Sequence, residues 1–269
     1  MLSICLTIYN KAHLILDVLN GIVKNTIGAY ELICNFDGCT DESESIASKF
    51  LYENVKDYKI LFADNVFETK ANNMCLKEAS RNYVCIIQDD QIITEKDWDV
   101  RILRPFKEFS DVFAVTGRTA HNYYENKNSK FLNSPTNDIG EWSDVVLPCD
   151  IADRTNTFRD EFTIRSTVNR GPLCIRHDDL IVMDYLDEIY APQELCEHDT
   201  MYRMHKKLGK VCGFYDIGWW SKPEFGGTRD EKGNTKRWLF EANHKNSKIF
   251  LERHREALNN RIMETRVLK

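Results

Sequence analysis

The chain has 269 residues, is 42% hydrophobic and carries a formal net charge of −6. This length suits one large α/β domain with insertions, and the mild acidity excludes a basic nucleic-acid-binding surface as the main function. The nine cysteines are scattered without CxxC pairs, and no apolar run approaches the roughly 20 residues that span a bilayer. We therefore expect a cytoplasmic protein with reduced thiols, no secretory leader and no transmembrane segment, and leave open a peripheral association with a membrane.

The first half of the chain alternates strand-like apolar runs with helical patterns. Strands are predicted over residues 4–8, 31–36, 58–62 and 83–88. Helices are predicted between them, over residues 15–22, 41–53 and 70–80, the second opened by a capping box. This alternation predicts right-handed βαβ crossovers and a Rossmann-like, mostly parallel sheet with helices on both faces.

The second half is less regular. Residues 117–165 are polar and are interpreted as loops and short strands rather than as a separate domain. Order returns with a strand over residues 173–175, a helix over residues 199–208 that Gly209 ends, and a strand over residues 211–215. From residue 236 the pattern predicts a charged helical tail.

Polar residues follow three of the predicted strands. They are residues 9–11, residues 37–41 and the pair Asp89 and Asp90. Ligands of parallel sheets bind beyond the carboxyl ends of the strands, so these residues are expected to meet at one rim. None carries a GxGxxG or P-loop signature, which disfavours a dinucleotide site and a P-loop.

Asp89 and Asp90 are the most informative pair, because two carboxylates at the end of a buried strand repel each other unless a positive group neutralises them. Mg²⁺ or Mn²⁺ is such a group, since nucleotide sites hold these ions with one or two carboxylates plus phosphate oxygens. The alternative is a solvated acidic loop after an edge strand.

Several motifs resemble those of the family-2 glycosyltransferases of the GT-A fold. Residues 4–10 look like the family's opening strand, residues 36–41 (FDGCTD) like its Asp-Asp-Gly-Ser-Thr-Asp turn, and residues 70–90 like the helix and strand that lead to its DxD-type metal element. Residues 170–172, 186–192 and 197–209 resemble its acceptor half with the catalytic carboxylate. The resemblance implies a single GT-A domain over residues 1–235, with a nucleotide-sugar-binding half (1–116) and an acceptor half (117–235), followed by a C-terminal helical extension (236–269).

The resemblance also implies roles for the strand-end residues. Asp37 would accept a hydrogen bond from the base of the donor nucleotide, most often uracil, which offers an imide N–H. Thr7, Tyr9 and Asn10 would line the base and ribose pocket. A turn role for Asp37 and strand-end packing for the other three are the structural alternatives.

For the metal, the resemblance implies that Asp90 binds Mn²⁺ or Mg²⁺ and that Asp89 approaches the ribose or the metal. Family members often carry a further acid beside this pair, where this sequence has glutamines. Lys70 would add positive charge near the diphosphate, unless it is an ordinary solvated lysine at a helix start. His244 is a candidate third metal ligand, because neutral imidazole can serve.

Glu197 and Asp199 flank His198 where the family's acidic motif precedes a helix. We predict Asp199 as the catalytic base, because a helix N-terminus keeps a carboxylate ionised. Glu197 is the alternative base, and Asp199 is alternatively a plain helix cap.

The resulting hypothesis is an inverting glycosyltransferase. It would move a sugar from a nucleotide diphospho-sugar, a UDP-sugar in the first instance, to a hydroxyl of a glycan, lipid-linked or protein acceptor. One rival is a sugar-nucleotide nucleotidyltransferase, although residues 9–12 (YNKA) replace the Gly-rich phosphate loop such enzymes need. The other rival is a non-catalytic carbohydrate-binding protein on a transferase fold, against which the retained acids argue.

Overall fold

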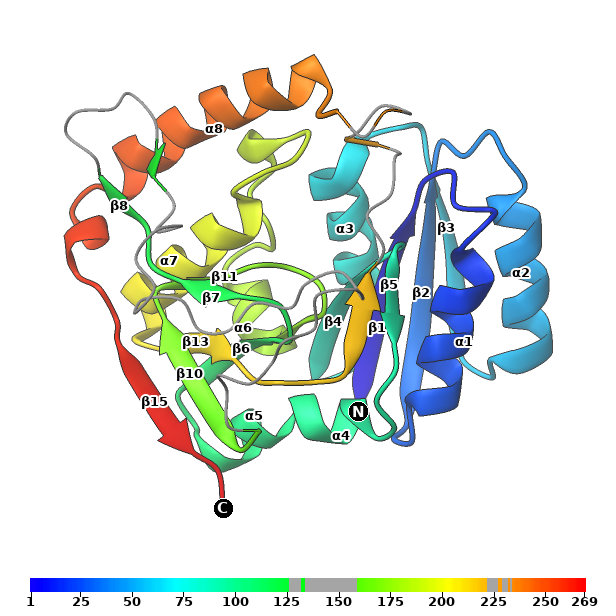
Figure 1. The fold of residues 1–269 in the computed structure, drawn as a ribbon, viewed down its shortest axis with the longest axis horizontal. Helices are drawn as coiled ribbons and strands as arrows, with labels where there is room; N and C mark the ends of the chain where they lie inside the picture. The colour runs from blue at the N-terminus through cyan, green and yellow to red at the C-terminus, as the bar shows by residue number, and fades with distance from the viewer. Residues whose placement is uncertain (126–131, 134–158, 222–226, 229–231, 233) are drawn as a thin grey trace.

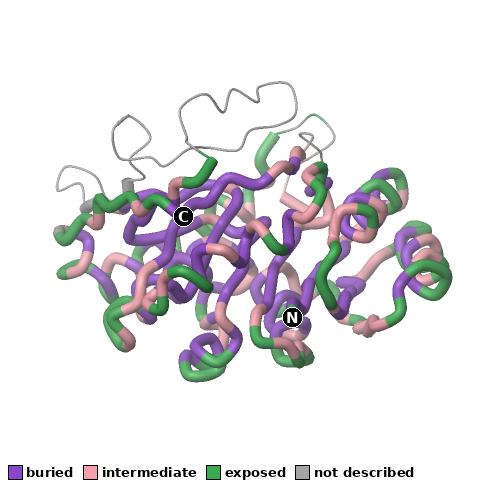
Figure 2. Tube along the Cα trace, turned by 90° about the horizontal axis from the view of Figure 1, so that it is seen from below, coloured by how far each residue is buried: buried purple, intermediate pink, exposed green. Residues whose placement is uncertain are grey.

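The structure is a computed structural model, and it describes residues 1–125, 132–133, 159–221, 227–228, 232 and 234–269. Within these ranges nine strands form one mixed sheet in the order β15-β10-β13-β6-β12-β4-β1-β2-β3. Figure 1 shows the sheet at the centre of the molecule with helices around it. The buried part of the trace runs along the central strands, and the exposed part lies mainly on the outer helices and loops (Figure 2).

The N-terminal half has the predicted alternation. Its elements are β1 (Leu2–Ile8), α1 (Ile15–Asn25), β2 (Tyr30–Asp37), α2 (Ser43–Asn54), β3 (Tyr58–Ala63), α3 (Phe67–Glu78) and β4 (Tyr83–Gln88). β1 lies between β2 and β4 and is parallel to both. The chain crosses from β1 to β3 by way of α1 and α2 and then returns through α3 to β4, so α1 and α2 cover one face and α3 the other (Figure 1). The predicted α/β class is confirmed.

The middle of the chain turns the sheet from parallel to mixed. It contains β5 (Gln91–Ile93), α4 (Trp98–Ile102), α5 (Arg104–Glu108), β6 (Val112–Thr116), β7 (Ala120–His121), β8 (Tyr124–Glu125), β9 (Leu132–Asn133), β10 (Glu161–Arg165), β11 (Thr167–Val168) and β12 (Leu173–Arg176). β12 lies between β4 and β6 and is antiparallel to both. The long connection after β6 brings the chain back into the sheet at the end where β6 leaves it, so β12 runs in the opposite direction. Much of the region predicted as loops and short strands, residues 126–131 and 134–158, lies outside the described residues.

The remaining elements complete the sheet and form the tail. They are α6 (His177–Val182), η1 (Glu188–Tyr190), α7 (Cys196–Leu208), β13 (Val211–Phe214), β14 (Trp219–Ser221), α8 (Arg237–His254), η2 (Ala257–Asn259) and β15 (Glu264–Val267). Gly209 ends α7 in the left-handed conformation, as predicted. No helix in the described ranges is long and apolar enough to cross a membrane.

The tail contains the predicted helix and also a strand that the sequence pattern missed. β15 pairs antiparallel with β10 at the edge of the main sheet. Its sequence, ETRV, has the charged character of an edge strand, and Arg266 from it donates to both oxygens of Asp111 at 2.6 and 2.8 Å. A four-residue charged segment carries too little apolar periodicity to be recognised as a strand.

Candidate active site

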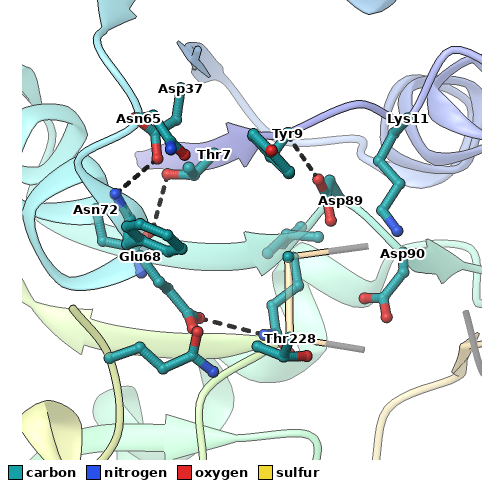
Figure 3. A pocket seen from close by; sticks show the side chains of 15 residues that line it. Thr7, Tyr9, Lys11, Asp37, Asn65, Glu68, Asn72, Asp89, Asp90 and Thr228 are labelled. Atoms are coloured by element: carbon teal, nitrogen blue, oxygen red, sulfur yellow. Dashed lines mark hydrogen bonds between the residues drawn. The ribbon is translucent and has the colours of Figure 1, made fainter. Parts of the chain in front are cut away.

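A cavity opens at the carboxyl ends of β1, β2 and β4. Its lining includes five of the predicted residues, Thr7, Tyr9, Asp37, Asp89 and Asp90. In Figure 3, Asp37 and Thr7 lie on one side of this cavity and Asp89 and Asp90 on the other, with Tyr9 between them. Parallel strands brought these residues together as the strand-end argument expected.

Asp37 ends β2 and is 3% exposed. Its two carboxylate oxygens accept from the backbone amides of Val66 and Phe67, at 2.7 and 2.8 Å, where α3 begins. Gly38 follows with φ +68°, so the turn needs its glycine. Asp37 therefore fixes the loop between β3 and α3 and also borders the cavity, and each oxygen keeps a second lone pair for another donor.

Of the three residues predicted to line the base and ribose pocket, Thr7 and Tyr9 line the cavity. The Thr7 hydroxyl donates to Asn72 Oδ1 at 3.0 Å, and the Tyr9 backbone amide donates to Asp89 Oδ2 at 2.9 Å. Asn10 is not part of the cavity lining. Its Oδ1 accepts from the Thr40 amide at 2.8 Å, so this residue joins two loops instead.

Asp89 and Asp90 follow β4 and are both partly buried. Burial raises the pKa of Asp89 and the neighbouring Asp90 charge adds to the rise, while Lys11 and the Tyr9 amide oppose it, and the net result is a pKa of about 7. Lys11 is 6% exposed and lines the same cavity. The pair is therefore an electrostatically unfavourable arrangement that a cation would relieve.

The donor set at this position fits a hard divalent ion. Two carboxylates at a cavity are the protein ligands that Mg²⁺ or Mn²⁺ takes when phosphate oxygens complete its coordination. Within the described part of the chain, no group of three or more His, Cys, Asp or Glu side chains could hold a metal by itself. The structure does not bring His244 to the pair, because this residue is exposed on α8 and does not line the cavity.

Lys70 is also placed away from the cavity, exposed on α3. Glu68 and Asn72 of the same helix line the cavity, and a residue two positions from each of them points to the opposite side of a helix. Lys11, from the loop after β1, is the lysine beside Asp89. Lys11 belongs to the polar residues predicted to follow the first strand, and no individual role was expected for it.

A buried ionic chain leads from the cavity to the first turn of α7. Arg170, 8% exposed, donates through Nε and Nη2 to the carboxylate of Glu68, the second contact at 2.8 Å. Its Nη1 donates to Glu197 Oε1 at 2.5 Å. One guanidinium thus joins α3 to α7, and its planar fork suits two carboxylates at once.

Glu197 is 3% exposed. Burial by itself would raise the pKa of its carboxyl, but the Arg170 charge, His198 and the hydrogen bonds that the carboxylate accepts together outweigh burial and lower the pKa to about 2. His198 contributes to this lowering, with Nε2 3.7 Å from Glu197 Oε1 and Nδ1 2.7 Å from the Thr167 hydroxyl. Glu197 is therefore ionised throughout the physiological range.

Asp199 lies on the other side of α7. Residues two positions apart on a helix point about 200° apart, so Glu197 and Asp199 cannot face the same cavity. Asp199 is completely buried, and its carboxylate accepts from four side chains: Tyr190 Oη (3.0 Å), His254 Nε2 (2.8 Å), Arg253 Nη1 (3.1 Å) and Arg203 Nε (2.6 Å). It is not a helix cap either, because α7 begins at Cys196 and Leu195 occupies the cap position.

Comparison with known families identifies the chain. The family model "Glycosyl transferase family 2" matches residues 3–171. The chain belongs to this family. The match contains the five predicted cavity residues, and it favours sugar transfer over nucleotidyl transfer.

One curated relative of this family-2 glycosyltransferase shares a short stretch of sequence with it. "Glycosyltransferase GlyG" of Streptococcus pneumoniae serotype 4 is 28% identical over 96 residues, which are 35% of this chain and 32% of that protein. The chain thus spans about a third of this curated relative.

Two solved structures share the fold. TarS 1-349 of S. aureus, solved in complex with UDP-GlcNAc, is 14% identical with a TM-score of 0.54, over 84% of this chain and 59% of that one. The mannosyltransferase PcManGT from Pyrobaculum calidifontis, solved with GDP-Man and Mn²⁺, is 12% identical with a TM-score of 0.55, over 80% of this chain and 54% of that one. These likenesses confirm a GT-A-like fold.

Two features of the site could not be predicted from the sequence: the place of Glu68 in the cavity lining and the contact of Arg170 with both Glu68 and Glu197. Arg170 was noted only as part of a family-like motif, and Glu68 lies just ahead of the predicted start of its helix. Their contact joins positions 102 residues apart, so no local pattern signals it.

Proposed function

We propose that this protein is an inverting glycosyltransferase that moves a sugar from a nucleotide diphospho-sugar to an acceptor hydroxyl. The observation that carries the proposal is the convergence of Asp37, Asp89 and Asp90 on one cavity at the carboxyl ends of neighbouring strands. Membership of glycosyltransferase family 2 supports the reaction class. The sugar nucleotides in the TarS and PcManGT structures support the class of donor.

Within this proposal the donor is a UDP-sugar. Asp37 accepts from the uracil imide with its remaining lone pairs, while the two backbone amides keep its carboxylate oriented. Lys11, buried beside Asp89, supplies the positive charge near the diphosphate that the sequence analysis assigned to Lys70. The acceptor is a glycan, a lipid-linked sugar or a protein.

Asp90, with Asp89 beside it, would hold Mn²⁺ or Mg²⁺ together with the diphosphate oxygens. Such an ion offsets the charge that develops on the leaving nucleoside diphosphate. Asp89 contributes as a carboxylate, so it must lose its proton before the ion binds, and Lys11 favours that loss.

We propose Glu197 as the catalytic base in place of Asp199. Four side chains donate to the Asp199 carboxylate. Within the described residues, Oε2 of Glu197 accepts a single hydrogen bond, from the weakly donating thiol of Cys196 at 3.4 Å. The ionic chain through Arg170 and Glu68 connects Glu197 to the donor cavity. A carboxylate of low pKa suffices here, because the acceptor O–H becomes strongly acidic as its oxygen bonds to the anomeric carbon.

The test measures release of the nucleoside diphosphate from a panel of UDP- and GDP-sugars, with Mn²⁺ or EDTA, together with calorimetric binding of UDP. Glu197→Gln should abolish transfer and leave UDP binding close to wild type. Asp90→Asn should weaken metal-dependent UDP binding. Glu53→Gln and Asp17→Asn, exposed on α2 and α1, are matched controls that should leave both readouts unchanged.

Three outcomes would contradict parts of the proposal. Near-normal transfer by Glu197→Gln removes the base assignment, and tighter binding of GDP than UDP removes the uracil assignment to Asp37. Binding of sugar nucleotides without turnover under any condition favours the carbohydrate-binding alternative.

A further inference from the structure

The segment between η1 and α7 has a backbone that needs outside support. Glu194 and Leu195 have φ values of +78° and +69°, in the left-handed region that residues other than glycine rarely adopt. Such residues persist only where the surrounding structure holds them. This segment leads into α7 two residues before Glu197, and its Gln193 lines the donor cavity. The conformation of residues 190–195 therefore determines where Glu197 points.

The support comes from α8. Asn246 of this helix is completely buried, and its Nδ2 donates to the carbonyls of Tyr190 (2.7 Å), Gln193 (2.8 Å) and Glu194 (3.1 Å). Three carbonyls around one atom identify that atom as the amide nitrogen. Asn246 Oδ1 is buried with no hydrogen-bond partner, which is unfavourable. The three hydrogen bonds that Nδ2 donates are therefore the reason for an asparagine at this position.

A second anchor lies at the C-terminal end of α8, two turns beyond Asn246. Arg253 and His254 donate to Asp199, in the first turns of α7. Figure 1 shows α8 running alongside α7 over this length. The two anchors hold the chain on either side of Glu197, and Thr69 at the start of α3 adds a third contact by donating its amide to the Pro192 carbonyl at 3.1 Å.

We propose that Asn246 is a positioning residue for sugar transfer, and that α8 belongs to the catalytic unit rather than to a separate extension. Asn246 holds residues 190–195 so that Gln193 and Glu197 keep their places relative to the donor cavity. This inference rests on the proposed role of Glu197. The family model matches residues 3–171, and α8 lies outside this range.

The experiment compares Asn246→Leu with Ser247→Ala in the full chain. Leucine is close to asparagine in shape but donates nothing. Ser247 is also buried on α8, and its hydroxyl donates to Asn243 within the helix, so its variant removes a buried hydrogen bond without touching the loop. Steady-state transfer, UDP binding by calorimetry and hydrogen exchange at the amides of residues 193–197 are measured well below the midpoint of thermal unfolding.

Asn246→Leu should lower kcat by about 10- to 100-fold, the effect of a small misplacement of a catalytic group, and leave the Kd of UDP within about threefold of wild type. Exchange at residues 193–197 should accelerate, and Ser247→Ala should change neither quantity. A lower melting temperature with unchanged kcat would show a merely structural role and overturn the proposal. If Asn246→Leu does not fold, Asn246→Ser, which keeps one donor, should show the same changes at smaller amplitude, and wild-type kcat in that variant overturns it.

Hydrogen exchange separates this inference from the proposed function. If the wild-type protein transfers no sugar from any donor, the proposed function fails. In that case accelerated exchange in Asn246→Leu still supports the conclusion that Asn246 holds residues 190–195 in place, and unchanged exchange refutes it.

Discussion

Because of the carboxylate pair at the end of β4, we predict that the protein loses stability as the pH rises. The pKa of Asp89 is raised to about 7 by burial and by Asp90, whereas an unfolded aspartate titrates near pH 3.9. Between about pH 4 and pH 7 the native protein therefore binds more protons than the unfolded chain. The free energy of unfolding must fall as the pH rises through this window and level off above it. At about 1.4 kcal/mol per pH unit, the full loss is about 4 kcal/mol.

Asp89→Asn removes this penalty. The amide keeps an oxygen for the Tyr9 backbone N–H, which contacts Asp89 at 2.9 Å, but it never ionises. Without metal, the variant should match wild type near pH 4 and exceed it at pH 8. Because the Asp89 side chain is partly exposed, solvent screens the repulsion, and we expect a gain of about 2 kcal/mol rather than the full amount.

Urea unfolding in EDTA at several pH values between 4.5 and 8 is the assay, with Asp17→Asn on the exposed face of α1 as the control. Addition of Mn²⁺ and UDP should reverse the order of stability, because the wild type alone gains from binding. A difference between wild type and Asp89→Asn that is the same at low and high pH would refute the electrostatic reasoning.

Four further predictions concern the rest of the site. Asp199→Asn should lower the free energy of unfolding by about 3 kcal/mol in urea, because it removes the buried carboxylate that pairs with Arg203 and Arg253, and a stable variant would contradict the contacts described. Arg170→Met should lower the free energy of unfolding by about 3–5 kcal/mol, because Glu68 and Glu197 lose the cation that pairs with them, and it should abolish transfer. Unchanged kinetics would show that the ionic chain has no part in catalysis. Gly38→Ala should lower the free energy of unfolding by about 1–3 kcal/mol in chemical denaturation, because a φ of +68° is strained for alanine. The added Cβ would also lie 2.9 Å from Asn65 in the loop before α3. A variant as stable as wild type would argue against this turn. Mn²⁺ affinity, measured by calorimetry in the absence of nucleotide, should fall as the pH drops below about 7 because Asp89 gains a proton, and flat affinity between pH 5.5 and 8 would exclude Asp89 from the metal site.

Local patterns in the sequence determined the first half of the fold and the donor side of the site. The apolar run predicted as a strand over residues 83–88 is β4, with the same bounds. Because the carboxyl ends of parallel strands lie at one edge of a sheet, the position of Asp37 at the end of β2 and of Asp89 and Asp90 after β4 was enough to predict that they meet. Periodicity and turn chemistry are local, so one sequence carries them completely.

Only the tertiary structure shows the surroundings of Glu197 and Asp199. Whether Glu197 or Asp199 faces the donor side depends on which side of α7 packs against the sheet and which against α8, and a shift of two positions reverses the answer. The contact of Arg170 with Glu68, and that of Asn246 with the loop before α7, join residues that are far apart in the chain. Contacts of this kind follow from how whole elements pack, which no local period in the sequence encodes.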